Sequence, residues 1–93
     1  MKVSLVVPLF NEEQTIGAFY DAVRREPGLH GHVVDIVFIN DGSSDRTAEV
    51  ARAIALADSD VVLINLSRNF GKEAALFAGL EYATGEAVVP MDV

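Results

Sequence analysis

The residues best suited to chemistry stand in a short polar turn that follows an apolar run. Residues 36–39 read IVFI, residues 40–45 read NDGSSD, and a helical pattern begins after them. This order is typical of a buried parallel strand, a tight loop and the N-terminus of a helix. Asp41 would then lie at the carboxyl edge of a sheet, where its carboxylate could accept hydrogen bonds from a base imide or a ribose hydroxyl. The alternative is a local role, in which Asp41 binds the backbone of its own turn.

Polar side chains also follow the other apolar runs. They are Asn11, Glu12 and Glu13 after residues 3–8, Ser67, Arg68 and Asn69 after residues 61–66, and Asp92 after residues 87–91. Because the carboxyl ends of parallel strands share one edge of a sheet, these groups are expected to converge. Arg68 and Lys72 could neutralise a diphosphate, and Asp92 is a natural ligand for Mg²⁺ or Mn²⁺. The alternatives are solvated surface charge for the two cations and a favourable helix-start charge for Glu12.

The apolar runs alternate with helical patterns along the chain. Apolar or small residues recur at i, i+3, i+4 and i+7 in two stretches, formed by Ile16, Phe19, Tyr20 and Val23 and by Thr47, Val50, Ala51 and Ile54. Ser43, Ser44 and Asp45 suit the start of the second helix. A third helix is expected over residues 72–83, and its nearly continuous apolar surface predicts burial against more than one neighbour. The fold class is therefore α/β, a Rossmann-like parallel βαβαβαβ sheet with helices on both faces.

Composition excludes several classes of protein. The 93 residues suffice for one small domain, and a 51% apolar content argues against disorder. The absence of cysteine excludes disulfides and thiolate metal sites, and the net charge of −7 argues against a nucleic-acid partner. The apolar runs are much shorter than the roughly 20 residues that span a bilayer. His30 and His32 flank Gly31 without a third ligand nearby, so a plain connector is expected there.

Common phosphate motifs are missing from the sequence. No G-x-G-x-x-G follows the first apolar run, and the pair Gly71-Lys72 lacks the earlier glycine and the following Ser or Thr of a P-loop. Dinucleotide oxidoreductases and P-loop NTPases are therefore disfavoured. A nucleotidyltransferase and a receiver- or flavodoxin-like binding module remain as alternatives.

Four segments together resemble a known enzyme family. They are VVPLFNEE at residues 6–13, NDGSSDRT at residues 40–47, RNFGKE at residues 68–73 and PMD at residues 90–92. In this order they resemble the family 2 inverting glycosyltransferases with a GT-A fold. The third segment is most similar to the polyprenyl-phosphate branch, which includes dolichyl-phosphate mannose synthases and bactoprenol glucosyltransferases.

The resemblance implies a UDP- or GDP-linked sugar donor. The similarity to the polyprenyl-phosphate branch implies a lipid-linked acceptor, a polyprenyl phosphate. The residues that it places around the nucleotide are Pro8, Phe10, Asn11, Glu12, Asp41, Ser43, Arg68 and Lys72. It implies that Asp92 is the first aspartate of a D-x-D metal motif, with Mg²⁺ or Mn²⁺ bridging the diphosphate and stabilising the leaving group. Asn40 departs from the family pattern, in which many members have a further aspartate.

Residues 1–93 are expected to be the N-terminal, donor-binding part of a longer protein, because the second metal aspartate would follow Val93. The resemblance assigns the general base and the acceptor pocket to that later part, so no catalytic residue is named here and the 93 residues alone are expected to be inactive. It also implies a cytoplasmic protein attached to the cytoplasmic face of a membrane. An uncovered sheet edge would favour a homodimer. The base, the sugar and the acceptor stay open.

Overall fold

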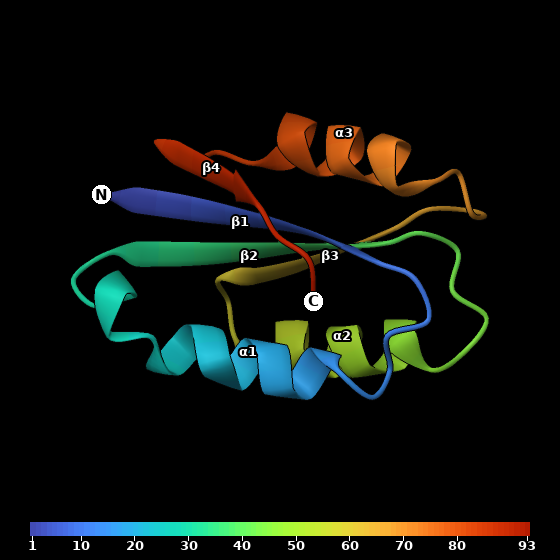
Figure 1. Cartoon of the computed structure of the whole chain (residues 1–93), viewed down its shortest axis with the longest axis horizontal. Coiled ribbons are helices and arrows are strands. Elements are labelled where there is room, and N and C mark those ends of the chain that lie inside the picture. Colours follow the sequence, from blue (N-terminus) through green and yellow to red (C-terminus); the bar gives the residue numbers. More distant parts are fainter.

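A parallel sheet forms the middle layer of the computed structural model, which describes residues 1–93 (Figure 1). Its strands are β1 (Lys2–Leu9), β2 (Val33–Asn40), β3 (Val61–Asn65) and β4 (Ala87–Pro90). The strand order is β3-β2-β1-β4, and Leu5 in β1 lies opposite Ile36 in β2 and Val89 in β4. The predicted parallel α/β class is confirmed.

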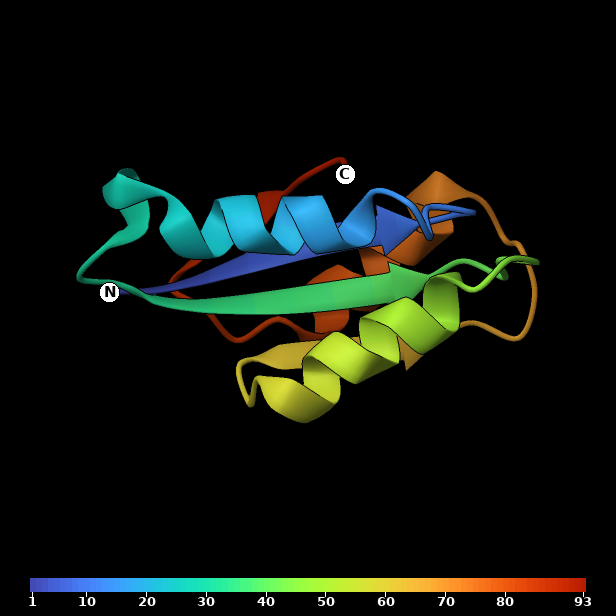
Figure 2. The ribbon, with the colours of Figure 1, turned by 90° about the horizontal axis from the view of Figure 1, so that it is seen from below.

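Helices cover both faces of this sheet. Helices α1 (Ile16–Arg25) and α2 (Thr47–Ala57) pack on one face, and α3 (Lys72–Tyr82) packs on the other (Figure 1). Figure 2, seen from the face that they cover, shows α1 and α2 side by side with β2 visible between them. A short 3₁₀ turn, η1 (Pro27–Leu29), lies in the connector that precedes β2. No helix in the structure combines the length and apolar character needed to cross a membrane.

Successive side chains of a strand point to opposite faces of the sheet, so the core is divided into two clusters. The larger cluster, under α1 and α2, includes Val3, Leu5, Val7, Leu9, Val34, Ile36 and Phe38. The smaller one, under α3, is formed by Val6, Val37, Ile39 and Ala75. Because both faces of β1 and β2 are covered, their sequences are apolar at successive positions, as buried parallel strands require.

Helix α3 lies close to the sheet through one glycine. A Cβ at Gly79 would stand 2.4 Å from Val6 Cγ1 and 2.6 Å from Ile39 Cδ1, so only a residue without a side chain permits this approach. The outer face of α3 has no partner in this chain, since Phe77 is 67% and Leu80 43% exposed. The expectation that the third helix is buried against more than one neighbour is therefore wrong for these residues.

A polar cluster joins α1 to the C-terminal end of α2. The Tyr20 hydroxyl donates to Asp58 Oδ2 at 2.6 Å, and Arg24 Nε donates to the same oxygen at 3.0 Å. Burial alone raises the pKa of Asp58, but the bonds from Tyr20 and the Asp60 amide and the charge of Arg24 outweigh it and lower that pKa. The hydrogen bond to Asp58 raises the pKa of Tyr20. At neutral pH this cluster therefore stabilises the α1–α2 layer.

Candidate functional site

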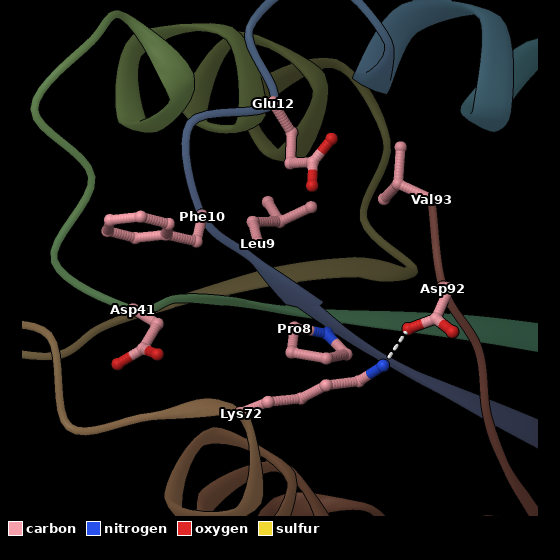
Figure 3. A pocket seen from close by; sticks show the side chains of 8 residues that line it. All are labelled: Pro8, Leu9, Phe10, Glu12, Asp41, Lys72, Asp92 and Val93. Atoms are coloured by element: carbon pink, nitrogen blue, oxygen red, sulfur yellow. Dashed lines mark ion pairs between the residues drawn. The ribbon is translucent and has the colours of Figure 1, made fainter.

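The site lies where the order of the strands reverses. From β1 the chain builds β2 and β3 on one side and then returns to place β4 on the other side of β1. In open α/β sheets such a switch point leaves a crevice at the carboxyl ends of the strands, where ligands bind. A cavity of about 230 Å³ occupies this position, and its walls are Pro8, Leu9, Phe10, Glu12, Asp41, Lys72, Asp92 and Val93 (Figure 3).

The structure brings most of the predicted site residues together. The cavity walls include Pro8, Phe10, Glu12, Asp41, Lys72 and Asp92. The other predicted residues, Asn11, Ser43 and Arg68, lie on the adjoining loops and are not part of the walls. Leu9 is also a wall, and it lies within the segment 8–12 that the family resemblance placed at the nucleoside. Sequence reasoning missed Val93, for which the position next to Asp92 was the only available signal.

Asn11 and Ser43 lock the loop after β1 to the loop after β2. Asn11 has a positive φ of 53°, and its Oδ1 accepts a hydrogen bond from the Ser44 amide at 2.9 Å. The Asn11 amide in turn donates to Ser43 Oγ at 3.0 Å, and the Glu12 amide donates to Thr47 Oγ1 at 2.8 Å. These side chains therefore fix the wall on which Glu12 stands. Thr47 shares this role, although the sequence indicated only a helical position for it.

Asp45 supports the same junction from the start of α2. Its carboxylate accepts hydrogen bonds from the Thr47 amide at 2.9 Å and from the Glu13 amide at 3.3 Å. Burial tends to raise the pKa of Asp45, but these bonds and one from the Thr47 hydroxyl outweigh it and lower the pKa. Of the residues expected to cap this helix, Asp45 is the one whose side chain binds the amide of the first helical residue.

Asn40 links β2 to β3 beneath the site. It is buried, its Nδ2 donates to Asn65 Oδ1 at 3.0 Å, and its Oδ1 accepts from the Ser43 amide at 3.2 Å. The Asn40 amide is the donor in the first bond and the acceptor in the second, whereas a carboxylate could only accept at neutral pH. The departure from the family pattern at position 40 therefore has a structural role in this chain.

Asp41 is buried beside the cavity and is 3% exposed. Its carboxylate points toward the segment that enters α3 (Figure 3), where it accepts hydrogen bonds from the amides of Phe70 at 2.8 Å and Gly71 at 3.1 Å. The local alternative for Asp41 is wrong, since Asn40 is the residue that binds the turn amide of Ser43.

The charged groups of the site lie on opposite walls. The Lys72 ammonium forms an ion pair with Asp92 across the cavity (Figure 3), and both side chains are more than half exposed. Glu12 directs its carboxylate into the cavity from the first loop (Figure 3). The Arg68 guanidinium lies 4.6 Å from the ring centroid of Phe70, on the loop that leads to Lys72.

Asp92 is the one predicted ligand for a divalent metal in this chain. Asp92 offers the hard oxygen donor that Mg²⁺ and Mn²⁺ prefer. No group of three or more His, Asp or Glu side chains is arranged to hold a metal, and the carboxylate of Asp92 is already paired with Lys72. The residues present therefore do not complete a metal site.

Residues 4–93 match the family model described as glycosyl transferase family 2. The chain belongs to this family. Two relatives are each 56% identical to it over 93 residues: a bactoprenol glucosyl transferase of Shigella phage SfV and a prophage bactoprenol glucosyl transferase homolog of Escherichia coli (strain K12). The match covers 100% of this chain and 30% of each relative, so the family 2 chain spans about a third of their length.

A solved structure shows the same architecture. The mannosyltransferase PcManGT from Pyrobaculum calidifontis, in complex with GDP-Man and Mn²⁺, superposes with a TM-score of 0.85 at 29% identity. The superposition covers 97% of this chain and 26% of the mannosyltransferase. The predicted GT-A-like fold and the family resemblance are both confirmed.

Proposed function

We propose that this chain is the donor-binding part of a glycosyltransferase and that a nucleotide-sugar, UDP- or GDP-linked, occupies the cavity at the switch point. The observation that carries the proposal is the composition of the cavity in a family 2 chain. An apolar and aromatic wall, the carboxylates of Glu12, Asp41 and Asp92, and the ammonium group of Lys72 line one space of about 230 Å³. A nucleoside diphosphate offers the matching groups, which are a flat base, ribose hydroxyls and two phosphates.

Each wall suits a different part of the donor. Phe10 is 47% exposed and lines the cavity, as does Pro8, so both offer apolar surface to a base. Glu12 would accept hydrogen bonds from the base or from the ribose hydroxyls. Lys72 would exchange its pairing with Asp92 for a phosphate oxygen, with Arg68 nearby as a second cation.

In this proposal Asn11 and Ser43 shape the cavity and do not contact the donor themselves. Their hydrogen bonds join the first two loops and so hold Glu12 at the cavity. Asp92 would supply one protein oxygen to a divalent cation bound with the diphosphate. The remaining ligands would have to come from the nucleotide, from water or from residues outside this chain.

The proposed acceptor is a polyprenyl phosphate, and transfer would proceed with inversion. This is supported by the names of the relatives, which are bactoprenol glucosyl transferases, and by the segment RNFGKE at residues 68–73. The reaction would take place at the cytoplasmic face of a membrane. We assign no general base to these residues, so the chain alone would bind the donor without transferring the sugar.

A titration of the chain with UDP and with GDP, each with Mg²⁺, tests the proposal. Backbone amide NMR signals of Glu12, Asp41 and Lys72 should shift with at least one nucleotide, whereas signals of the η1 connector should not. Absence of any shift with both nucleotides would contradict the proposal and favour a binding module of another kind. Release of UDP from UDP-glucose by the chain at enzyme-like rates would contradict the assignment of donor binding alone.

A further inference from the structure

The loops after β2 and β3 are joined by one carboxylate. Asp41 Oδ1 accepts the Phe70 amide at 2.8 Å, and Oδ2 accepts the Gly71 amide at 3.1 Å. The Asn69 side-chain amide adds a bond of 3.2 Å to the Asp41 carbonyl and one of 3.4 Å to Oδ2. Both oxygens of this buried carboxylate are therefore directed at the third loop, residues 66–71.

Gly42 and Gly71 allow this arrangement. Gly42 has a φ of +67°, and a Cβ there would stand 2.2 Å from the Asn69 nitrogen and 2.3 Å from the Arg68 carbonyl carbon, so the two loops touch backbone to backbone. Gly71 has φ 101° and ψ 158°, a conformation essentially restricted to glycine. The third loop thus enters α3 through a conformation that few residues adopt, and the bond from Gly71 to Asp41 helps to hold it there.

This loop carries the positive charge of the site. Lys72 directly follows Gly71 and lines the cavity, while Arg68 stacks on Phe70, whose amide Asp41 binds. The position of both cations therefore depends on a backbone that Asp41 holds from the neighbouring strand.

We propose that Asp41 is a positioning residue, which acts on the donor by holding the third loop so that Lys72 and Arg68 face the phosphates. The proposal rests on the nucleotide-binding function proposed above. It differs from a direct contact between Asp41 and the nucleoside in one respect. Any change that loosens the third loop should weaken nucleotide binding, even when the carboxylate of Asp41 is intact.

Two substitutions separate these roles. Asp41→Asn replaces one accepting oxygen with an NH₂ group, so either the Phe70 or the Gly71 amide, whose hydrogen bonds are partly buried, loses its acceptor. Asn69→Ala removes only the bonds from the Asn69 side chain and leaves the carboxylate unchanged. Asp21→Asn is the matched control, since it makes the same chemical change at an exposed position on α1.

The first measurement is amide hydrogen exchange in the nucleotide-free chain. Asp41→Asn should speed the exchange of Phe70 and Gly71 by about 10- to 100-fold, the range expected for bonds to a charged acceptor, and more than it speeds the core amide of Phe38. Asn69→Ala should speed the same two amides by a smaller factor. A general loss of stability would instead speed all amides together, so the local effect distinguishes positioning from a structural role.

The second measurement is the Kd for UDP and for GDP with Mg²⁺. Affinity should fall for Asp41→Asn and, by a smaller factor, for Asn69→Ala, in the order of their exchange rates, and Asp21→Asn should match the unsubstituted chain. Unchanged affinity in Asn69→Ala despite faster loop exchange would overturn the proposal in favour of direct contact. So would weaker binding in Asp41→Asn with unchanged exchange at Phe70 and Gly71. If the unsubstituted chain bound neither nucleotide although both amides were protected, the nucleotide-binding function would fail while the loop contact stood.

Discussion

Replacing Gly42 with alanine tests the close contact between the second and third loops. The new side chain meets two penalties, because Gly42 has φ +67° and its Cβ would stand 2.2 Å from the backbone nitrogen of Asn69. The left-handed conformation alone costs about 1–2 kcal/mol for alanine. Overpacking against atoms that cannot easily move adds about 1–3 kcal/mol. We therefore expect Gly42→Ala to lower the free energy of unfolding by about 2–5 kcal/mol, a large part of the roughly 5–15 kcal/mol of a typical domain.

Gly31→Ala supplies the matched control. Gly31 also has a positive φ, +87°, but nothing lies within 4 Å of its Cβ position, so only the conformational cost of about 1–2 kcal/mol applies. Urea unfolding of the two variants, compared at unchanged m value, gives the difference directly. Equal losses of stability in the two variants would refute the backbone contact between the loops. In addition, Gly42→Ala should weaken UDP or GDP binding, whereas Gly31→Ala should not.

The remaining predictions concern packing, pH and charge. Gly79→Ala should destabilise the chain by up to about 2 kcal/mol in urea, since overpacking outweighs a helix-propensity gain of about 1 kcal/mol, whereas Gly17→Ala in α1, with open space around it, should be neutral or stabilising. Because the pKa of Asp58 is lowered in the folded chain, its ionised form stabilises the fold above the unfolded pKa of about 3.9, and this contribution is lost as pH falls through the folded value. Asp58→Asn should therefore reduce the loss of stability between pH 6 and pH 3, and an unchanged loss would contradict the role of the Tyr20 cluster. Lys72→Gln should weaken UDP or GDP binding about 3- to 10-fold at low salt, whereas Lys72→Arg should retain most of the affinity. Equal affinities of Lys72→Gln and the unsubstituted chain would exclude a phosphate contact.

The secondary structure was largely predictable from the sequence, because its signals are local. The apolar run that contains residues 36–39 became β2, and the run at residues 61–66 became β3, whose end differs by one residue. The periodic stretches became α1 and α2 for the same reason, since a helix face repeats at short range. The third helix formed where expected, but its burial was overestimated, because apolar content alone does not say how many neighbours a helix has.

Among the site residues, the sequence indicated those that stand directly at strand ends. Glu12, Asp41 and Asp92 were predicted to share one edge, and all of them line the cavity. What the sequence could not show was which group each side chain contacts. The sequence indicated Thr47 only as a helical position and Asn69 only as a polar residue at a strand end, yet the first accepts the Glu12 amide and the second binds Asp41.

The sequence by itself determined the succession of strands and helices, the apolar character of both sheet faces and the membership of glycosyl transferase family 2. Only the tertiary structure decided that β4 joins the free edge of β1, because backbone hydrogen bonds along a strand edge carry no sequence code. That choice creates the switch point and its cavity. It was also the tertiary structure that directed the carboxylate of Asp41 to Phe70 and Gly71. These residues are 29 and 30 positions away from Asp41 in the sequence, and the contact depends on the close backbone packing that Gly42 permits.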